Sequence, residues 1–245
     1  MSGAGPSERA RRGRATSAVE AAPGAPQGVP FGAVLLDLDG CLIDSNDAHA
    51  RAWSATLARF GRRIPTSRLR GEIGKGGSEI LRDLVTPAEH HFLGAAMGEL
   101  ETELFLKAFP RVRPVPGAAA AVRSMHRAGI AVILASSAAR DVVRRAIARL
   151  RLEKSLLGFT SADDVEKAKP FHDVFALAIR RFRLAARRPV AVGDTPYDVA
   201  AAHQIGVPCL ALRSGGFPDR TLARADGVFD DLGELWSKGR GFFAA

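Results

Sequence analysis

Cysteine is scarce in this chain: only Cys41 and Cys209 occur, in apolar surroundings and at a spacing that fits neither a zinc site nor a redox pair. We expect two buried, reduced thiols, which favours a cytoplasmic location. The chain also lacks any apolar run of about 18 residues, which excludes a membrane-spanning helix. Aromatic residues make up 7% of the chain and do not alternate with basic residues, as they do on surfaces that bind single-stranded nucleic acid.

Basic residues are in excess, 35 against 26 acidic ones, for a formal net charge of +9. Such an excess suits nucleic acid or an acidic surface as a partner. The basic residues are spread over separate segments, however, as Arg62, Arg111, Arg144 and Arg187 illustrate. We therefore expect a generally basic surface and no nucleic-acid partner.

Residues 1–30 are rich in Gly, Pro, Ala, Ser and Arg and show no apolar periodicity, so we expect a disordered tail. The apolar core of a secretory signal is missing there. Arginine and serine also suit an organellar transit peptide, but Glu8, Glu20 and the prolines disfavour the amphipathic helix of such a peptide. A flexible extension is the interpretation that fits best.

Apolar runs alternate with helical patterns in the rest of the chain. The runs are apolar at successive positions, which is typical of strands buried on both faces of a parallel sheet; they are 33–37, 130–136, 189–194 and 207–213. The segments with helical spacing are 118–129, 139–150, 171–182 and 197–206. This alternation predicts an α/β, doubly wound, Rossmann-like parallel sheet.

Residues 46–115 contain helical patterns and no strand-like run. We therefore expect a small α-helical cap domain at 46–115, inserted into a core domain built from 31–45 and 116–245. The segment "RVRPVPG" at 111–117 is the expected linker back to the core.

Polar side chains stand where the predicted strands end, and a lysine precedes one of the strands; they are Asp37, Asp39, Ser136, Asp194, Asp198 and Lys169. The carboxyl ends of parallel strands meet at one edge of a sheet, where ligands bind. Carboxylates suit Mg²⁺, and a carboxylate can also act as a nucleophile. A lysine and a hydroxyl can offset the charge of a transferred phosphoryl group, so the set indicates phosphoryl transfer.

Each of these residues also has an ordinary structural interpretation. The Asp39-Gly40 pair is a common turn, Ser136 suits a helix N-cap, and Asp198 suits a capping box with Thr195. A purely structural explanation would have to apply independently at each of these positions along the chain. It is therefore the weaker explanation of the residues taken together.

Four segments resemble the ordered motifs of the haloacid dehalogenase (HAD-like) superfamily: "DLDGCLIDS" at 37–45, the serine after "VILA", "KAKP" and "VGDTPYD". The subgroup is similar to phosphoglycolate phosphatase and β-phosphoglucomutase. The resemblance covers about residues 31–230, and the small helical cap of that subgroup falls at the strand-free segment.

The resemblance implies separate roles for the acidic residues. Asp37 would be the nucleophile and a metal ligand, and Asp39 the general acid and then the base, with its backbone carbonyl on the metal. Asp194 would be a further ligand of Mg²⁺, supported by Asp198. Asp44 and Ser45 would mark the exit into the cap, with a structural role.

The resemblance also implies residues that bind the substrate. Ser136 would hydrogen-bond the phosphoryl group, and Lys169 would offset its charge and that of Asp37. In the cap, His49 would couple closure to the acid and base. Apart from the resemblance, Lys75 stands in the glycine-rich turn at 72–80, and from that position we expect it to contact an anionic substrate. A hinge histidine and a tight glycine-rich turn are the structural alternatives for these two. Cys41 replaces the more usual Thr or Val, which we expect to affect packing only.

We therefore expect a Mg²⁺-dependent phosphatase that acts on a small phosphorylated metabolite through an aspartyl-phosphate. The acid at position 39 is absent from dehalogenases and phosphonate-cleaving members of the superfamily, so it favours phosphate esters. A sugar phosphomutase stays open as the alternative, because of His49 and Lys75. A non-catalytic protein that binds through its basic surface is the third hypothesis. The sequence does not define the oligomeric state.

Overall fold

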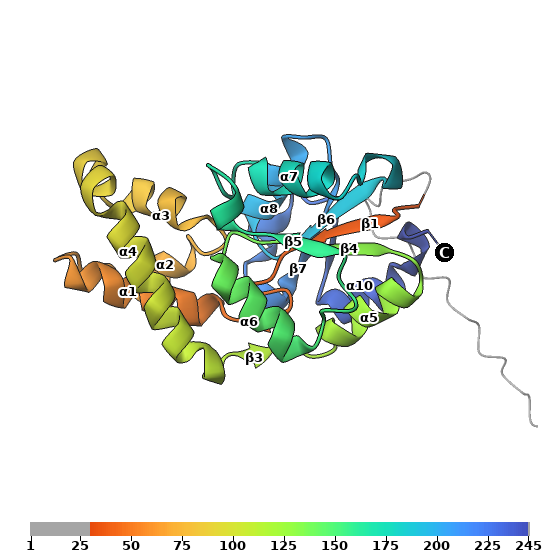
Figure 1. Ribbon diagram of the computed structural model, residues 1–245, viewed down its shortest axis with the longest axis horizontal. Helices are drawn as coiled ribbons and strands as arrows, with labels where there is room; N and C mark the ends of the chain where they lie inside the picture. The colour runs from red at the N-terminus through yellow and green to blue at the C-terminus, as the bar shows by residue number, and fades with distance from the viewer. Residues whose placement is uncertain (1–29, 245) are drawn as a thin grey trace, which may run out of the picture.

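The computed structural model describes residues 30–244, and it shows a parallel β-sheet covered by helices on both faces, with a group of helices at one end (Figure 1). All but the last residue of the predicted tail, 1–30, lie outside the described residues. Within the described part of the chain, no helix is long and apolar enough to span a bilayer.

Six parallel strands of the described residues form the main sheet, in the order β5-β4-β1-β6-β7-β8. They are β1 (Ala33–Leu36), β4 (Ala131–Ala135), β5 (Gly158–Thr160), β6 (Pro189–Gly193), β7 (Cys209–Leu212) and β8 (Gly227–Phe229). The chain builds the sheet outward from β1 on one side and from β6 on the other, and these two strands are neighbours. Ligands bind at such a switch point in doubly wound sheets. The predicted fold class is confirmed.

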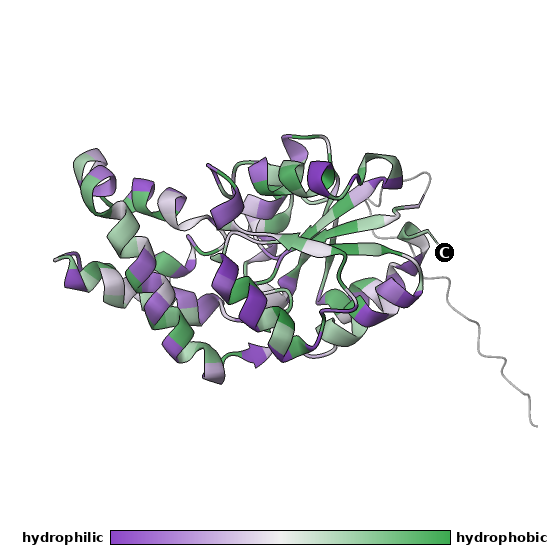
Figure 2. Cartoon of the chain, in the orientation of Figure 1, coloured by the Kyte–Doolittle hydropathy of each residue, from purple (hydrophilic) through white to green (hydrophobic). Residues whose placement is uncertain are grey.

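The strands are continuously apolar because each face of the sheet packs on a different set of helices. Val34 and Leu36 belong to the apolar cluster that contains α5 (Ala118–Arg127), α6 (Arg140–Leu150) and α10 (Leu232–Lys238). Ala33 and Leu35 belong to the cluster that contains α7 (Asp173–Arg181) and α8 (Pro196–His203). Figure 2 shows the apolar strands between these two helical layers.

Four helices pack on one another at the end of the sheet: α1 (Asn46–Arg59), α2 (Thr66–Arg70), α3 (Gly77–Leu84) and α4 (Pro87–Ala108). They have an apolar cluster of their own, in which Trp53, Leu57, Leu69, Ile80 and Met97 are buried. A further short helix is α9 (Asp219–Leu222), and 3₁₀ turns lie at Phe109–Arg111, Ala162–Asp164, Ala185–Arg187, Arg213–Gly215 and Arg240–Phe242. We call α1–α4 the helical unit.

The helical unit is connected to the sheet domain through a short antiparallel strand pair, β2 (Ile43–Asp44) and β3 (Arg113–Pro114). The expectation that 46–115 is free of strands is wrong at β3. No local pattern marks a two-residue strand that contains proline, because it exists only through its pairing with β2, 70 residues earlier in the chain. The domain boundaries at 46–115 stay a prediction.

Candidate active site

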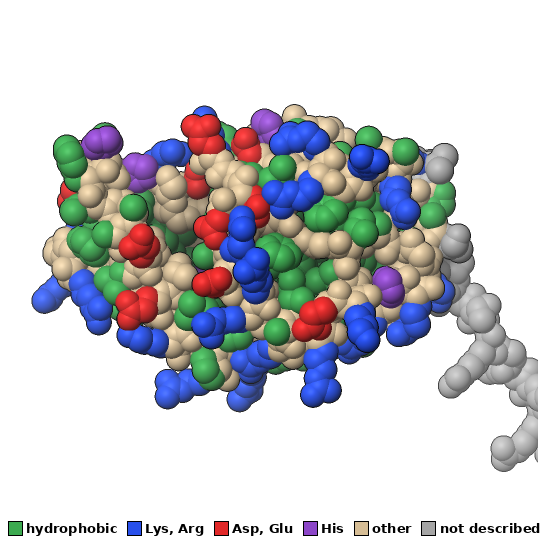
Figure 3. Space-filling model, viewed as in Figure 1, with side chains coloured by type: hydrophobic (Ala, Val, Ile, Leu, Met, Phe, Trp, Pro, Cys, Tyr) green, Lys and Arg blue, Asp and Glu red, His purple; other side chains and the backbone are tan. Residues whose placement is uncertain are grey.

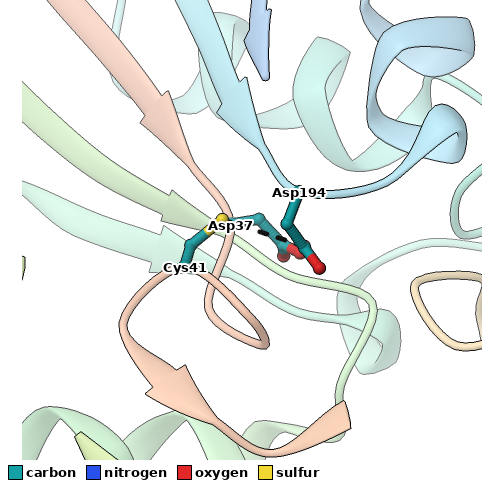
Figure 4. Close-up of side chains that lie close together, drawn as sticks. All are labelled: Asp37, Cys41 and Asp194. Atoms are coloured by element: carbon teal, nitrogen blue, oxygen red, sulfur yellow. Dashed lines mark hydrogen bonds between the residues drawn. The ribbon is translucent and has the colours of Figure 1, made fainter. Parts of the chain in front are cut away.

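The ends of β1 and β6 bring two carboxylates together. Asp37 follows β1 and is 3% exposed, and Asp194 follows β6 and is fully buried. Because Leu36 and Val192 are partners in the sheet, the residues that follow them leave it side by side. One oxygen of each carboxylate and the sulfur of Cys41 all lie within 4.8 Å of one another (Figure 4).

A tight turn after β1 places Cys41 in this group. Gly40 has a φ of +71°, and a Cβ atom there would overlap the Asp194 carboxylate and the Asn46 amide, so the turn requires glycine. The Cys41 sulfur lies 3.8 Å from Asp194 Oδ1. The expectation that Cys41 affects packing only is therefore wrong, because its thiol touches the site. Burial raises the pKa of the thiol well above its usual value, so Cys41 stays protonated.

The two carboxylates lack the positive charge that they need for full ionisation. Burial raises the pKa of Asp37 to about 7, although Lys169 opposes the shift. Burial, Asp198 and Asp37 raise the pKa of Asp194 well above its usual range. A divalent cation between Asp37 and Asp194 would remove this penalty, and carboxylate oxygens are ligands that suit Mg²⁺.

Asn46, the first residue of α1, supports the same centre. Its Nδ2 donates to Asp194 Oδ2 at 2.8 Å and to the Gly215 carbonyl at 3.1 Å. Its Oδ1 is buried without a hydrogen-bond partner among the described residues. An unpartnered acceptor beside two carboxylates suits a hydrated metal ion, whose water molecules donate hydrogen bonds. The residues present therefore fit Mg²⁺.

Lys169 connects Asp37 to the first turn of α8. Its ammonium is fully buried and lies 2.8 Å from Asp37 Oδ1 and 2.7 Å from Asp198 Oδ1. Burial opposes the charge of Lys169, but Asp198 and Asp37 outweigh it and raise the pKa of the ammonium. Asp198 also accepts hydrogen bonds from the backbone N–H and hydroxyl of Thr195, which completes a capping box. Asp198 thus caps the helix and holds the lysine that contacts Asp37.

Asp39 turns away from Asp37 and Asp194, toward α1. Its Oδ1 accepts a hydrogen bond of 2.5 Å from Ser45 Oγ and lies 3.3 Å from His49 Nε2. Burial opposes ionisation of Asp39, but His49 and Ser45 outweigh it and hold the pKa below its ordinary value. Ser45, expected to have only a structural role, therefore belongs to the site. Asp44 is exposed in β2 and does not.

His49 is held from two sides by α4. Its Nδ1 pairs with Glu101 Oε1 at 2.8 Å, and its ring stacks on Phe105 with centroids 3.6 Å apart. Burial lowers the pKa of His49, but Asp39 and Glu101 outweigh this and raise it to about 10. The imidazole is therefore protonated at neutral pH and joins the helical unit to Asp39.

A cavity of about 200 Å³ opens between the helical unit and the carboxyl edge of the sheet. Four of the residues singled out in the sequence, Asp37, Asp39, His49 and Lys75, are among its lining residues. Other residues that line it are Trp53, Ile73, Ile80, Glu101, Thr102, Ser137, Val142 and Asp163. Its position and size suit a small molecule that reaches Asp37 and Asp39 from the side of the helical unit.

The two serines after β4 differ from the prediction. Ser136 is fully buried, does not line the cavity, and accepts a hydrogen bond from the Ala138 N–H at 3.0 Å. Ser137 lines the cavity, and its hydroxyl accepts from the Lys169 N–H at 3.3 Å. The phosphoryl contact predicted for Ser136 stays a prediction, and Ser137 is a candidate that the motif did not single out.

The ammonium of Lys75 is bound within the helical unit. It lies 2.5 Å from Glu72 Oε2 and 2.6 Å from Asp83 Oδ2, and 4.8 Å from the centre of the Tyr197 ring. Burial disfavours its charge, but the hydrogen bonds that the ammonium donates to Asp83 and Glu72 outweigh this and raise the pKa of Lys75. Lys75 therefore lines the cavity with a charge that two carboxylates already compensate.

Comparison with known proteins agrees with this geometry. The sequence model of the haloacid dehalogenase-like hydrolase family matches residues 34–212. The chain is 26% identical to validoxylamine A 7'-phosphate phosphatase of Streptomyces hygroscopicus subsp. limoneus, over 82% of this chain and 94% of that protein. It is also 26% identical to a phosphoglycolate phosphatase of Pseudomonas syringae pv. syringae, over 82% of this chain and 77% of that protein. A crystal structure of a hydrolase from Pseudomonas syringae superposes with a TM-score of 0.79 at 22% identity, over 87% of this chain and 100% of that chain.

Proposed function

Because this chain belongs to the haloacid dehalogenase-like hydrolase family and is a phosphoric monoester hydrolase, we propose that it hydrolyses a small phosphorylated metabolite through a phosphorylated Asp37, with Mg²⁺ as cofactor. One observation carries this proposal: a buried carboxylate, Asp37, lies between the ammonium of Lys169 and the carboxylate of Asp194. An anionic nucleophile, a fixed cation and a metal ligand are thereby combined at one point of the sheet edge.

The reaction divides between two carboxylates. A carboxylate oxygen of Asp37 attacks phosphorus, and the bond from phosphorus to the ester oxygen breaks. Asp39 gives a proton to that oxygen as the alcohol leaves. His49 Nε2 lies 3.3 Å from Asp39 Oδ1 and stabilises the carboxylate form of Asp39, the form that accepts a proton in the second half of the reaction. Asp39 then takes a proton from the water that attacks phosphorus, which releases phosphate and restores Asp37.

Fixed positive charge stabilises the phosphoryl group while it is transferred. Lys169 lies beside Asp37 and keeps its charge in the buried site. Asp37 and Asp194 would hold Mg²⁺, which supplies further charge to the phosphoryl oxygens when bound. Asn46 keeps the Asp194 carboxylate in place.

The direct test measures phosphate release from p-nitrophenyl phosphate and from a panel of phosphorylated metabolites, with and without Mg²⁺. Asp37→Asn and Asp39→Asn should each lower kcat by about a thousandfold or more, since each removes a group that forms or breaks a bond. Asp44→Asn, an exposed neighbour in β2, is the matched control. Mg²⁺-dependent hydrolysis that both active-site variants retain would contradict the proposal.

A sugar phosphomutase is the second candidate, favoured by His49, which joins the helical unit to Asp39. In that reaction the phosphoryl group returns from Asp37 to a sugar phosphate instead of passing to water. Incubation with β-glucose 1-phosphate and a bisphosphate activator separates the two. Formation of glucose 6-phosphate without net phosphate release would favour the mutase.

A binding protein that uses its basic surface is the third hypothesis. Lys and Arg side chains are scattered over the face in Figure 3, with acidic side chains among them. Several arginines are engaged in ion pairs, such as Arg62 with Glu89 and Arg213 with Asp219. On the face that Figure 3 shows, the basic side chains therefore do not form the single basic stripe that is typical of nucleic-acid binding. A nucleic-acid affinity that falls steeply with salt and is unchanged in Asp37→Asn would support the binding protein instead.

The compartment is part of the proposal. Cys41 and Cys209 are both buried and unpaired, which supports a reducing compartment such as the cytoplasm.

A further inference from the structure

The cavity wall that would face the organic part of a substrate carries as many acidic as basic side chains. Beyond Asp37 and Asp39, the charged side chains that line the cavity are His49, Lys75, Glu101 and Asp163. No arginine is among the lining residues in the described part of the chain. The cations available to a second negative group on the substrate are therefore His49 and Lys75.

Both cations are already compensated. Lys75 contacts two carboxylates, Glu72 and Asp83, at 2.5 and 2.6 Å. The two carboxylates together carry one more negative charge than the single positive charge of Lys75 can neutralise. An anion that approaches Lys75 would therefore meet a group with a net charge of about −1 and would have to displace a carboxylate from it.

His49 is compensated in the same way. Its ring lies between Asp39 Oδ1 at 3.3 Å and Glu101 Oε1 at 2.8 Å, and its face is covered by Phe105. Nδ1 is therefore hydrogen-bonded to Glu101, whereas Nε2 lies close to Asp39 without a hydrogen bond to any described residue. Two carboxylates face the single charge of the imidazolium, so among the lining residues His49 offers a second anion no uncompensated positive charge.

The rest of the wall favours an uncharged partner. Trp53, Ile73, Ile80 and Val142 supply apolar surface. Asp163 is exposed, and its carboxylate accepts a hydrogen bond from the Arg140 backbone N–H at 2.8 Å. The guanidinium of Arg140 pairs with Asp164 instead, so it does not offset Asp163.

We propose that the substrate of this site is a phosphate monoester whose organic part bears no second negative group, such as a polyol phosphate. The inference rests on the phosphatase function proposed above. Phosphorylated carboxylic acids and bisphosphates are disfavoured, because their second anion meets cations whose charge is already compensated and the further carboxylates Glu101 and Asp163.

The test compares pairs of probes that differ by one added anionic group: glycerol 3-phosphate against 3-phosphoglycerate, and glucose 6-phosphate against glucose 1,6-bisphosphate. Affinity is measured by calorimetry on the Asp37→Asn protein with Mg²⁺, so that binding is read without turnover. We expect the probe with one phosphate and no other anion to bind at least about tenfold more tightly, a difference equivalent to about 1.4 kcal/mol. Equal affinities, or tighter binding of 3-phosphoglycerate, would overturn the inference.

A second variant tests the cause. Asp83→Asn removes one of the two partners of Lys75, so 3-phosphoglycerate should bind several-fold more tightly while glycerol 3-phosphate is unchanged. Glu103→Gln is the matched control, because it removes one charge from α4 where Glu103 pairs with the exposed Lys107. If Asp83→Asn and Glu103→Gln have the same effect on the selectivity ratio, Lys75 does not determine it, and the inference fails.

Failure of the inference and failure of the proposed function give different results. Suppose that hydrolysis of p-nitrophenyl phosphate depends on Asp37 but probes with and without a second anion bind equally well. The proposed phosphatase function is then supported, and the inference about the substrate is wrong. If the wild-type protein hydrolyses none of the phosphate esters, the proposed function is wrong, and the inference that rests on it is wrong as well.

Discussion

At the scale of single residues, the site depends on one buried cation. Lys169 is fully buried and is the cation in contact with both Asp37 and Asp198. A buried ion pair adds little net stability over an apolar pair, but removing one partner leaves uncompensated charge behind. We therefore expect Lys169 to contribute to the stability of the folded protein as well as to the proposed chemistry.

Lys169→Met should lower the free energy of unfolding by about 3–5 kcal/mol, because two buried carboxylates lose their shared partner. Urea unfolding monitored by tryptophan fluorescence measures this change. Lys238→Met, which removes an exposed lysine paired with Glu234, should have no measurable effect. A Lys169→Met protein as stable as the wild type would mean that both carboxylates are protonated in the folded state.

His49 predicts a pH dependence of stability in the alkaline range. Its folded-state pKa of about 10 is raised above the ordinary value of 6.5, so the folded protein binds more protons than the unfolded chain between these values. The contribution of His49 is fully present below pH 6.5 and is lost as the pH rises through about 10. The wild-type protein should therefore lose more stability than His49→Gln between pH 6.5 and 10, which urea unfolding at several pH values would measure. Parallel curves for the two proteins would contradict the assignment.

Several contacts of the site carried no local sequence signal. His49 and Glu101 are 52 positions apart, on α1 and α4, and only the packing of these helices brings them together. The partners of Lys75 could likewise not be read from the chain, since a lysine in a glycine-rich turn looks free until its neighbours are placed. Asp37, Asp39 and Asp194 could be placed together because strand ends in a parallel sheet meet at one edge, whereas Lys169 was placed with them by the resemblance of "KAKP" to a family motif.

At the scale of elements, the strands were predictable where both of their faces are buried. The runs that contain β1, β4, β6 and β7 are continuously apolar, so their existence was evident. The edge strands β5 and β8 were not predicted: each has three residues, one of them glycine, and pairs with a single neighbour. Edge strands of this length depend on that neighbour more than on their own residues.

The turn after β1 gives a prediction at this scale. Gly40→Ala should reduce both stability and phosphatase activity, because a methyl group there overlaps the Asp194 carboxylate in addition to the strain of a positive φ. Gly61→Ala is a matched control: its φ is +79° and its added Cβ meets nothing within 4 Å. We expect about 1 kcal/mol of destabilisation for Gly61→Ala from strain alone, and more for Gly40→Ala. Thermal unfolding and the rate of phosphate release measure the two effects, and similar losses in both variants would show that the overlap is unimportant.

At the scale of the whole molecule, Mg²⁺ should stabilise the fold. A ligand that binds only the folded protein adds about 2.7 kcal/mol at a concentration one hundred times its Kd, so Tm should rise by several degrees. Asp194→Asn should abolish the rise, and Asp44→Asn should retain it. If Mg²⁺ does not change the Tm of the wild-type protein, the metal assignment is contradicted, even if the protein has phosphatase activity.

The β2–β3 pair has a consequence for how such a protein diversifies. The chain enters the helical unit after Asp44 and returns at Arg113, the residue paired with it. Since departure and return are adjacent, the segment between them can lengthen, shorten or change its sequence without rethreading any strand of the sheet. On the proposed function, the reacting residues Asp37 and Asp39 lie outside this segment, whereas most of the residues that line the cavity lie within it. Mutations confined to one contiguous stretch of codons, the stretch that encodes the segment between β2 and β3, can therefore change which substrate is accepted while the reaction stays the same.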